Sequence, residues 1–278
     1  MTAPTTALVT GAAGGIGLEV AQRLARQGHA VVALERDEEL ADRAATAIGH
    51  GAIPVACDLT DAAAVARLCA RIEAEWGPTL AFCLLNAGVV VPANVRDISP
   101  ADMDLQLEVM LTSAIHLARA ASRAMAERGG GHLVATVSQG AVLALPGSAT
   151  YSAAKAGLRA FLGALHLEMR GTGVTVGGVY PSAVDTPMLL HEAQHGGSLL
   201  NFVGTISTVA DVADGVEKAA RTGRVEVFVP ASDGLTTRLL QAFPRLVPLI
   251  LPVAERIGER GRRRYLARQV ATTDRNPR

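Results

Sequence analysis

The segment Ala7-Leu-Val-Thr-Gly-Ala-Ala-Gly-Gly-Ile-Gly17 decides how the rest of the chain is interpreted. It begins with a short apolar run that stops at glycines, and apolar residues with helical spacing follow from Ile16 to Gln27. The segment therefore predicts a strand, a tight turn and a helix. Glycines let such a turn close and let a dinucleotide pyrophosphate approach the backbone at the positive end of the helix. A plain tight turn is the alternative when this segment is taken alone.

Apolar runs and helical patterns alternate along the chain beyond this turn. Strands separated by helices of 12 or more residues predict an α/β fold, with a parallel sheet of about seven strands and helices on both faces. Functional loops are then expected at one end of the sheet. The predicted strands are 7–10, 30–34, 52–57, 80–85, 132–137, 174–179 and 224–229, and the predicted helices are 16–27, 37–48, 61–76, 99–127, 150–170 and 208–222.

Length and composition exclude several classes of protein. A chain of 278 residues suits one large α/β domain. The formal net charge is zero, so no global field recruits nucleic acid. The three cysteines, Cys57, Cys69 and Cys83, lack metal-ligand spacing and indicate reduced thiols in a cytoplasmic protein. The N-terminal residues carry no signal-peptide pattern.

The second predicted strand ends in Glu35-Arg36-Asp37. A carboxylate about twenty residues after the glycines accepts hydrogen bonds from the adenosine ribose of a dinucleotide and repels a 2′-phosphate. Glu35 therefore favours NAD. Arg36 leaves NADP open, since a guanidinium beside that ribose can hold the phosphate; a solvated charge is the other interpretation of Arg36.

A phenol and an amine lie four residues apart in Tyr151-Ser-Ala-Ala-Lys155. On a helix they share one face, so the Lys155 ammonium lies close to the tyrosine. A free tyrosine has a pKa of about 10, and a nearby cation in a desolvated cleft lowers it. Tyr151 is then a candidate general base toward an alcohol, or acid toward a ketone. Taken alone, the pair is also compatible with an exposed tyrosine and a solvated lysine.

Together, these motifs resemble the short-chain dehydrogenase/reductase family in its ordinary-length form, over about residues 5–230. The resemblance implies a Rossmann-type doubly wound fold, a nicotinamide cofactor and hydride transfer at a secondary alcohol or carbonyl. It implies that Ser138 hydrogen-bonds the substrate oxygen, that Tyr151 exchanges its proton, and that Lys155 lowers the tyrosine pKa and holds the nicotinamide ribose. Met188 is expected beside the substrate. The other implied cofactor contacts are Thr10, Gly11, Gly15, Ile16, Gly17, Asp58, Leu59, Asn86, Ala87, Gly88, Pro181 and Thr186.

Three positions depart from the family pattern. Met110 stands where the family usually has an asparagine that supports a water chain to the lysine, and a thioether cannot orient water well. Ser182 replaces the glycine of the usual Pro-Gly, and Leu85 replaces the first of two asparagines. Under the enzyme hypothesis Met110 faces a wet cleft, so we expect Met110→Asn to fold and to leave activity equal or increased.

Residues 188–207 occupy the place of the family's substrate lid. Their apolar side chains indicate either a hydrophobic rim of the substrate pocket or ordinary packing of a loop. His191 and His195 are interpreted as surface or lid residues, and no metal is expected. Beyond Pro230, an apolar stretch with prolines at 244, 248 and 252 precedes an arginine-rich segment. The prolines predict that no single long helix forms there. The stretch is too short to span a bilayer.

The sequence therefore predicts a catalytic domain over 1–230 and a C-terminal extension over 231–278 that packs on the pocket or on a partner subunit. Peripheral contact of this extension with an anionic membrane is the alternative. The expected activity is that of an NAD-dependent alcohol dehydrogenase or carbonyl reductase for a bulky apolar substrate, steroid-, terpenoid- or lipid-like, in a homodimer or homotetramer. A catalytically impaired dinucleotide-binding regulator or scaffold is the second hypothesis, prompted by Met110 and Ser182.

Overall fold

The computed structural model describes residues 4–275. Seven strands form one sheet in the order β3-β2-β1-β4-β5-β6-β7, and every neighbouring pair is parallel. Parallel neighbours need crossover helices, which the alternating sequence pattern supplies. The predicted seven-stranded parallel sheet is confirmed. The strands are β1 (Thr6–Thr10), β2 (Ala30–Glu35), β3 (Ile53–Ala56), β4 (Leu80–Leu85), β5 (Gly131–Thr136), β6 (Val174–Pro181) and β7 (Glu226–Val229).

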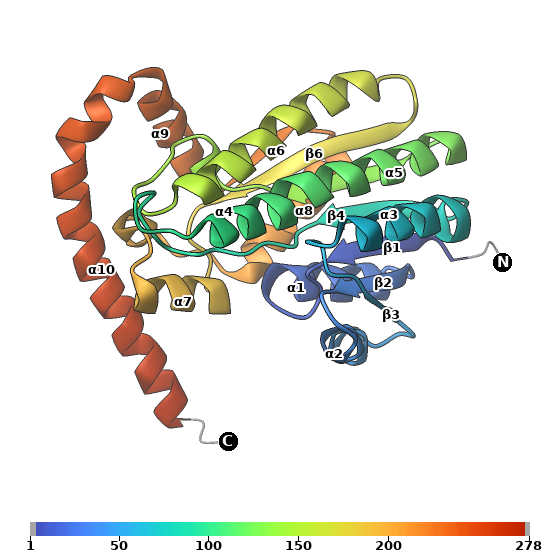
Figure 1. The fold of residues 1–278 in the computed structure, drawn as a ribbon, viewed down its shortest axis with the longest axis horizontal. Coiled ribbons are helices and arrows are strands. Elements are labelled where there is room, and N and C mark those ends of the chain that lie inside the picture. The colour runs from blue at the N-terminus through green and yellow to red at the C-terminus, as the bar shows by residue number, and fades with distance from the viewer. Residues whose placement is uncertain (1–3, 276–278) are drawn as a thin grey trace.

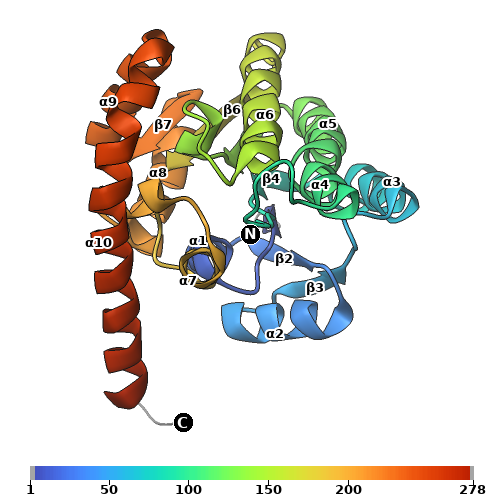
Figure 2. The same ribbon diagram turned by 60° about the vertical axis from the view of Figure 1, so that its left-hand side comes forward.

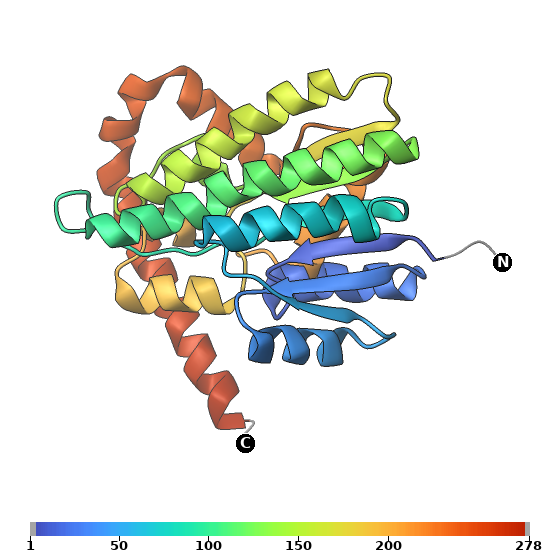
Figure 3. The same cartoon turned by 45° about the vertical axis from the view of Figure 1, so that its right-hand side comes forward.

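Helices cover both faces of this sheet (Figure 1). One layer contains α1 (Gly15–Arg26), α2 (Glu38–Ile48) and α8 (Val209–Thr222), whose buried side chains share a core with Val9 of β1. The opposite layer contains α3 (Ala62–Arg71), α5 (Ser113–Arg128) and α6 (Ala149–Glu168), which lie side by side in Figure 3. Leu8 belongs to this second core, because successive residues of a strand face opposite sides.

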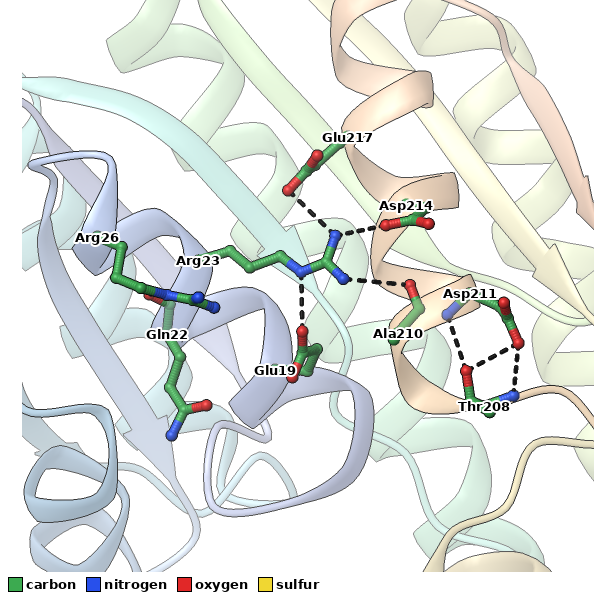
Figure 4. Close-up of polar contacts among 9 residues, drawn as sticks. All are labelled: Glu19, Gln22, Arg23, Arg26, Thr208, Ala210, Asp211, Asp214 and Glu217. Atoms are coloured by element: carbon green, nitrogen blue, oxygen red, sulfur yellow. Dashed lines mark hydrogen bonds and ion pairs between the residues drawn. The ribbon is translucent and has the colours of Figure 1, made fainter.

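Arg23 ties α1 to α8 at the edge of the first layer (Figure 4). Its guanidinium lies 2.6 Å from Asp214 and 2.8 Å from Glu19, and it also reaches the Ala210 carbonyl oxygen at 3.4 Å. A capping box between Thr208 and Asp211 begins α8 beside it. These contacts fix the helix that carries the glycine turn relative to the helix that precedes β7.

The long helix predicted over 99–127 is interrupted. It begins as α4 (Pro100–Leu107), passes through a π-helical turn at Glu108–Thr112 and continues as α5. The predicted helix 61–76 likewise ends in a π-helical turn at Ile72–Trp76. A π turn inserts one extra residue between two helical segments that each keep the ordinary helical spacing, so that spacing predicted one continuous helix.

The C-terminal part forms two helices around an elbow. α9 (Ala231–Ala242) is followed by a short 3₁₀ turn (Pro244–Leu246) and by α10 (Val247–Arg275), which stands along one side of the molecule in Figure 2. The expectation that the prolines prevent a long helix is wrong, because α10 contains two of the three, Pro248 and Pro252. Pro248 lies in the first turn of α10, where its missing N–H needs no partner, and Pro252 lies one turn further on. Only the turn at Pro244 separates the helices.

Candidate active site

A cavity of about 690 Å³ opens at the carboxyl ends of the central strands. The turn after β1, the turns after β4 and β5, the start of α6 and the segment after β6 all contribute to its wall. The helical segment over residues 187–202, which overlaps the predicted lid and is called the lid below, lies with the α9–α10 pair on its outer side. Ligands of open parallel sheets bind at this end, so the fold brings the cavity and the predicted motifs together.

The glycine turn begins helix α1 directly beside β4. Gly11 and Gly15 have positive φ values of 66° and 53°, which L-residues with side chains rarely adopt. A Cβ at Gly17 would overlap the Gly11 carbonyl oxygen. Gly11, Gly15 and Ile16 line the cavity, whereas Gly17 packs inside the turn.

The side chains of Asn86 and Thr10 hydrogen-bond within the protein and hold the glycine turn against the end of β4. The Asn86 amide donates to the carbonyl oxygens of Thr10 and Gly11 at 3.2 and 3.1 Å, and accepts from the Thr136 hydroxyl at 3.0 Å. The Thr10 hydroxyl accepts the N–H groups of Asn86 and Ala87 at 2.8 and 2.9 Å. Sequence reasoning missed Thr136, because a threonine within a buried strand resembles ordinary core.

Ser138, Tyr151 and Lys155 meet in the cavity wall. Ser138 follows β5, and its hydroxyl accepts the Gly140 N–H at 3.0 Å. Tyr151 and Lys155 lie one turn apart near the start of α6, with the Lys155 ammonium 5.9 Å from the centre of the tyrosine ring. Lys155 is only 4 % exposed and donates to the Thr136 carbonyl oxygen at 2.7 Å. Three residues from two elements thus bring a hydroxyl, a phenol and an amine together.

Burial sets the ionisation of this group. It raises the pKa of Tyr151 to about 12, although a hydrogen bond from Ser138 opposes the shift. It also lowers the pKa of Lys155 to about 8. The pKa of Tyr151 is therefore not lowered as expected, because desolvation outweighs the hydrogen bond to Ser138. A positive charge placed near the phenol would lower this pKa.

Glu35 reaches back from the end of β2 to the glycine turn. Its carboxylate accepts the Ala13 N–H at 2.7 Å, which places a negative charge at the edge of the turn. The Arg36 side chain is 72 % exposed and pairs with Asp37 at 3.3 Å. The two charges therefore lie in different environments, and only the carboxylate is fixed against the turn.

The remaining predicted residues lie around this site. Asp58 caps a local turn by accepting from the Thr60 N–H and hydroxyl at 2.9 and 2.8 Å, and Leu59 is buried beneath it. Thr186 caps helix α7 (Pro187–His195) and lies next to Gly15. Among the predicted ligand contacts, the cavity wall includes Ala87, Gly88, Pro181, Thr186 and Met188, whereas Glu35, Arg36, Asp58 and Leu59 lie outside it.

Met110 does not face a wet cleft, so that expectation is wrong. Its side chain is 1 % exposed and lies within the π-helical turn, against Gly88. With Lys155 and Ser113 it borders a void of about 10 Å³, room for about one water molecule. The residue thus occupies the expected position beside the lysine, but in a nearly dry environment.

We expect Met110→Asn to lower the free energy of unfolding by about 1–3 kcal/mol, because a buried amide lacks enough partners here. For a chain of this size, each 1 kcal/mol lowers Tm by about 2–4 °C. Thermal melting checks the result, with Met110→Leu as the volume-conserving control that costs less than about 1.5 kcal/mol. An asparagine variant as stable as wild type would show that the amide finds partners near Lys155.

The C-terminal helices contribute directly to the cavity wall. Val247, Ile250, Leu251 and Ala254 of α10 line it together with Leu240 of α9. α10 packs closely on the lid, since a Cβ at Gly258 would overlap the Leu199 carbonyl oxygen. The Tyr265 hydroxyl donates to Asp185 at 2.8 Å, next to Thr186.

Among residues 4–271, whose side chains the structure describes, His, Cys, Asp and Glu side chains form no cluster of three that could hold a metal ion. The rings of His191 and His195 stack at 4.2 Å on α7. Within the same part of the chain, no helix combines the length and apolar character needed to cross a bilayer.

A family model described as short chain dehydrogenase matches residues 5–197, more than half of the chain. The chain belongs to the short-chain dehydrogenase/reductase family. The predicted family is thus confirmed, and the protein is an oxidoreductase of that family, whose members bind NAD or NADP.

Individual relatives of this short-chain dehydrogenase have varied substrates in their names. D-threitol dehydrogenase of Mycolicibacterium smegmatis is 35 % identical over 68 % of this chain and 74 % of its own length. A 1-deoxy-11-beta-hydroxypentalenate dehydrogenase of Streptomyces avermitilis is 34 % identical over 82 % of this chain and 85 % of its own. The solved structure of a bulky-bulky ketone specific alcohol dehydrogenase from Comamonas testosteroni has a TM-score of 0.70 at 25 % identity, covering 88 % of this chain and 94 % of that one.

Proposed function

We propose that this protein is an NAD-dependent dehydrogenase or reductase for a bulky apolar secondary alcohol or the corresponding ketone. The observation that carries the proposal is the position of Ser138, Tyr151 and Lys155 in a cavity to which the lid, α9 and α10 contribute many apolar side chains, beside a few polar ones. A hydroxyl and a phenol suit an alcohol or carbonyl oxygen, and the surrounding wall suits a hydrocarbon body.

The residues at the carboxyl ends of the strands fit a dinucleotide. The close backbone approach at Gly11 and Gly15, next to the first turn of α1, provides a phosphate-sized cradle at a helix N-terminus. Gly88, Lys155 and Thr186 border the adjoining part of the cavity and would hold the nicotinamide end. When bound, the nicotinamide supplies hydride acceptance or donation and, in its oxidised form, a positive charge.

The chain's own residues provide the proton chemistry. Ser138 hydrogen-bonds the substrate oxygen, and Tyr151 accepts the hydroxyl proton of an alcohol or donates a proton to a ketone oxygen. Lys155 is held by Thr136 on the opposite side, so its position relative to the tyrosine is fixed. The apolar wall excludes water from the reacting carbon.

The names of relatives support a bulky apolar substrate. The pentalenate dehydrogenase and the bulky-bulky ketone specific enzyme are named for large substrates, whereas threitol is a small polyol. The extension that walls the cavity lies beyond the residues matched by the family model, so it is the element suited to setting substrate size. Turnover of a panel of bulky and small secondary alcohols, followed by the absorbance of reduced cofactor, tests the proposal; exclusive turnover of small polyols would contradict it.

The second hypothesis, a binding protein without chemistry, finds less support in the site. Its main basis was Met110, yet Ser138, Tyr151 and Lys155 remain grouped beside the buried thioether.

The exposed apolar side chains of Leu239, Phe243, Leu246 and Leu249 at the elbow suit contact with a partner subunit, in a homodimer or homotetramer. An anionic membrane surface is the other candidate for this contact.

We expect NAD to bind about 10-fold or more tightly than NADP. The Glu35 carboxylate is fixed at the glycine turn, and like charges about 4 Å apart at a protein surface repel by about 1–4 kcal/mol. Calorimetric titration with both cofactors measures the ratio. Glu35→Ser is expected to bring the Kd values for NAD and NADP closer together, and Arg36→Ser is expected to leave their ratio unchanged. Tighter NADP binding by the wild type would show that Glu35 does not face the ribose.

A further inference from the structure

Helix α7 of the lid carries a carboxyl group into the apolar part of the cavity. Glu192 is partly buried and lines the same cavity as Tyr151. Its environment raises the pKa of its carboxyl group to about 7, chiefly through burial. Its charge also opposes ionisation of Tyr151, so the two groups lie within electrostatic reach of each other. None of the catalytic steps described above uses this carboxyl group.

The lid is built around Glu192. One carboxylate oxygen accepts from the Asn201 amide at 3.2 Å, and Asn201 also lines the cavity. The chain turns back at Gly197, whose N–H donates to the Glu192 carbonyl oxygen at 2.8 Å and whose missing side chain leaves room for the Glu192 stem. The second carboxylate oxygen has no hydrogen-bond donor among the described residues. A partly buried carboxyl group kept in such a place is costly unless something pairs with it.

Apart from Asn201, no described side chain donates a hydrogen bond to the Glu192 carboxylate, although donors such as Gln139 and Thr205 also line the cavity. Leu189, Leu200 and Val203 line the cavity on the lid side, and α10 contributes Val247 and Ile250. A purely hydrocarbon substrate would desolvate Glu192 further without a hydrogen bond. A substrate with a hydrogen-bond donor at this point would instead donate to the carboxylate oxygen of Glu192 that lacks a partner.

We propose that Glu192 and Asn201 form a second polar binding site in the cavity, which recognises a hydroxyl group on the apolar substrate distant from the carbon that reacts. The proposal rests on the proposed function and deepens it: the substrate is an apolar diol or hydroxyketone rather than a plain hydrocarbon alcohol. A hydroxyl suits the site better than an ammonium, because it donates to a carboxylate and also accepts from a protonated carboxyl group.

The test compares a bulky cyclic secondary alcohol with the same ring carrying a second hydroxyl group on its far side. The wild type is expected to prefer the diol by about 10- to 100-fold in kcat/KM, the range of one hydrogen bond to a charged group. Glu192→Leu should remove the preference mainly through KM, while turnover of the plain alcohol is retained or increased. Glu192→Gln should keep part of the preference, since an amide still hydrogen-bonds.

Gln194→Leu, an exposed position on the same helix, is the matched control and should keep the full preference. Calorimetric binding of both alcohols is measured beside turnover. Equal binding of the two alcohols by the wild type, a preference that survives Glu192→Leu, or stronger selection of the matching amino alcohol would each overturn the inference. Turnover of neither alcohol would instead count against the proposed function, and the binding comparison would still decide the role of Glu192.

Discussion

Tyr151→Phe is expected to lower kcat by about 10²- to 10⁴-fold while leaving the Kd for NAD nearly unchanged. The hydroxyl group is the only part removed, and general acid–base catalysis contributes a factor of this size. The ring stays between Ser138 and Lys155, so the shape of the cavity is preserved. Steady-state kinetics and cofactor titration together check the result.

Tyr180→Phe is the matched control for this change. Tyr180 is fully buried in the second core, stacks on Phe228 at 5.1 Å and does not line the cavity. Loss of its hydroxyl should leave kcat unchanged. Activity of Tyr151→Phe within a factor of three of wild type would remove Tyr151 from the proton-transfer role.

Deletion of the residues after Ser232 is expected to raise KM for bulky substrates by about 10- to 100-fold, or to dissociate the proposed homo-oligomer. The deletion removes the cavity wall formed by Leu240 of α9 and Val247, Ile250, Leu251 and Ala254 of α10. Each 100 Å² of apolar contact contributes about 2.5 kcal/mol, which corresponds to a factor of that order. Kinetics with bulky and small alcohols, beside the mass in solution, measure both effects; unchanged values would show that the extension has no role in the site.

A milder variant separates loss of the wall from loss of the fold. Gly258→Ala places a Cβ against the Leu199 carbonyl oxygen, so α10 must move away from the lid. We expect Gly258→Ala to raise KM for bulky substrates, but by less than the deletion does. Gly163→Ala, in α6 where a Cβ meets no neighbouring atom, is the control and should keep KM unchanged.

The sheet could be predicted almost completely from the sequence, because most strands coincide with short apolar runs bounded by polar or glycine residues. The pairing of Tyr151 with Lys155 followed from a helical spacing of four, and the family resemblance added Ser138 to this pair. Position in the sheet could thus be inferred from local pattern.

The pKa values and the burial of individual side chains could not be inferred from the local sequence pattern. Met110 lies in a π-helical turn that the periodicity does not reveal, and its burial depends on Gly88 and Lys155 from other elements. Glu192 has the sequence context of a solvated lid residue, and only the tertiary structure brings it into the cavity with Tyr151. The pKa of Tyr151 is likewise governed by desolvation, a property of the whole surrounding fold.

The strand order has a consequence for the way the protein is made. β1 lies between β2 and β4, so the first half of the sheet can pair while later residues are still being synthesised. Ser138, Tyr151 and Lys155 lie just after β5 and at the start of α6. Residues 247–254, which close the cavity, leave the ribosome after all seven strands. Close to a hundred residues separate Lys155 from this wall, so at about 5–20 residues per second Ser138, Tyr151 and Lys155 leave the ribosome about 5–20 s before the residues that enclose the cavity.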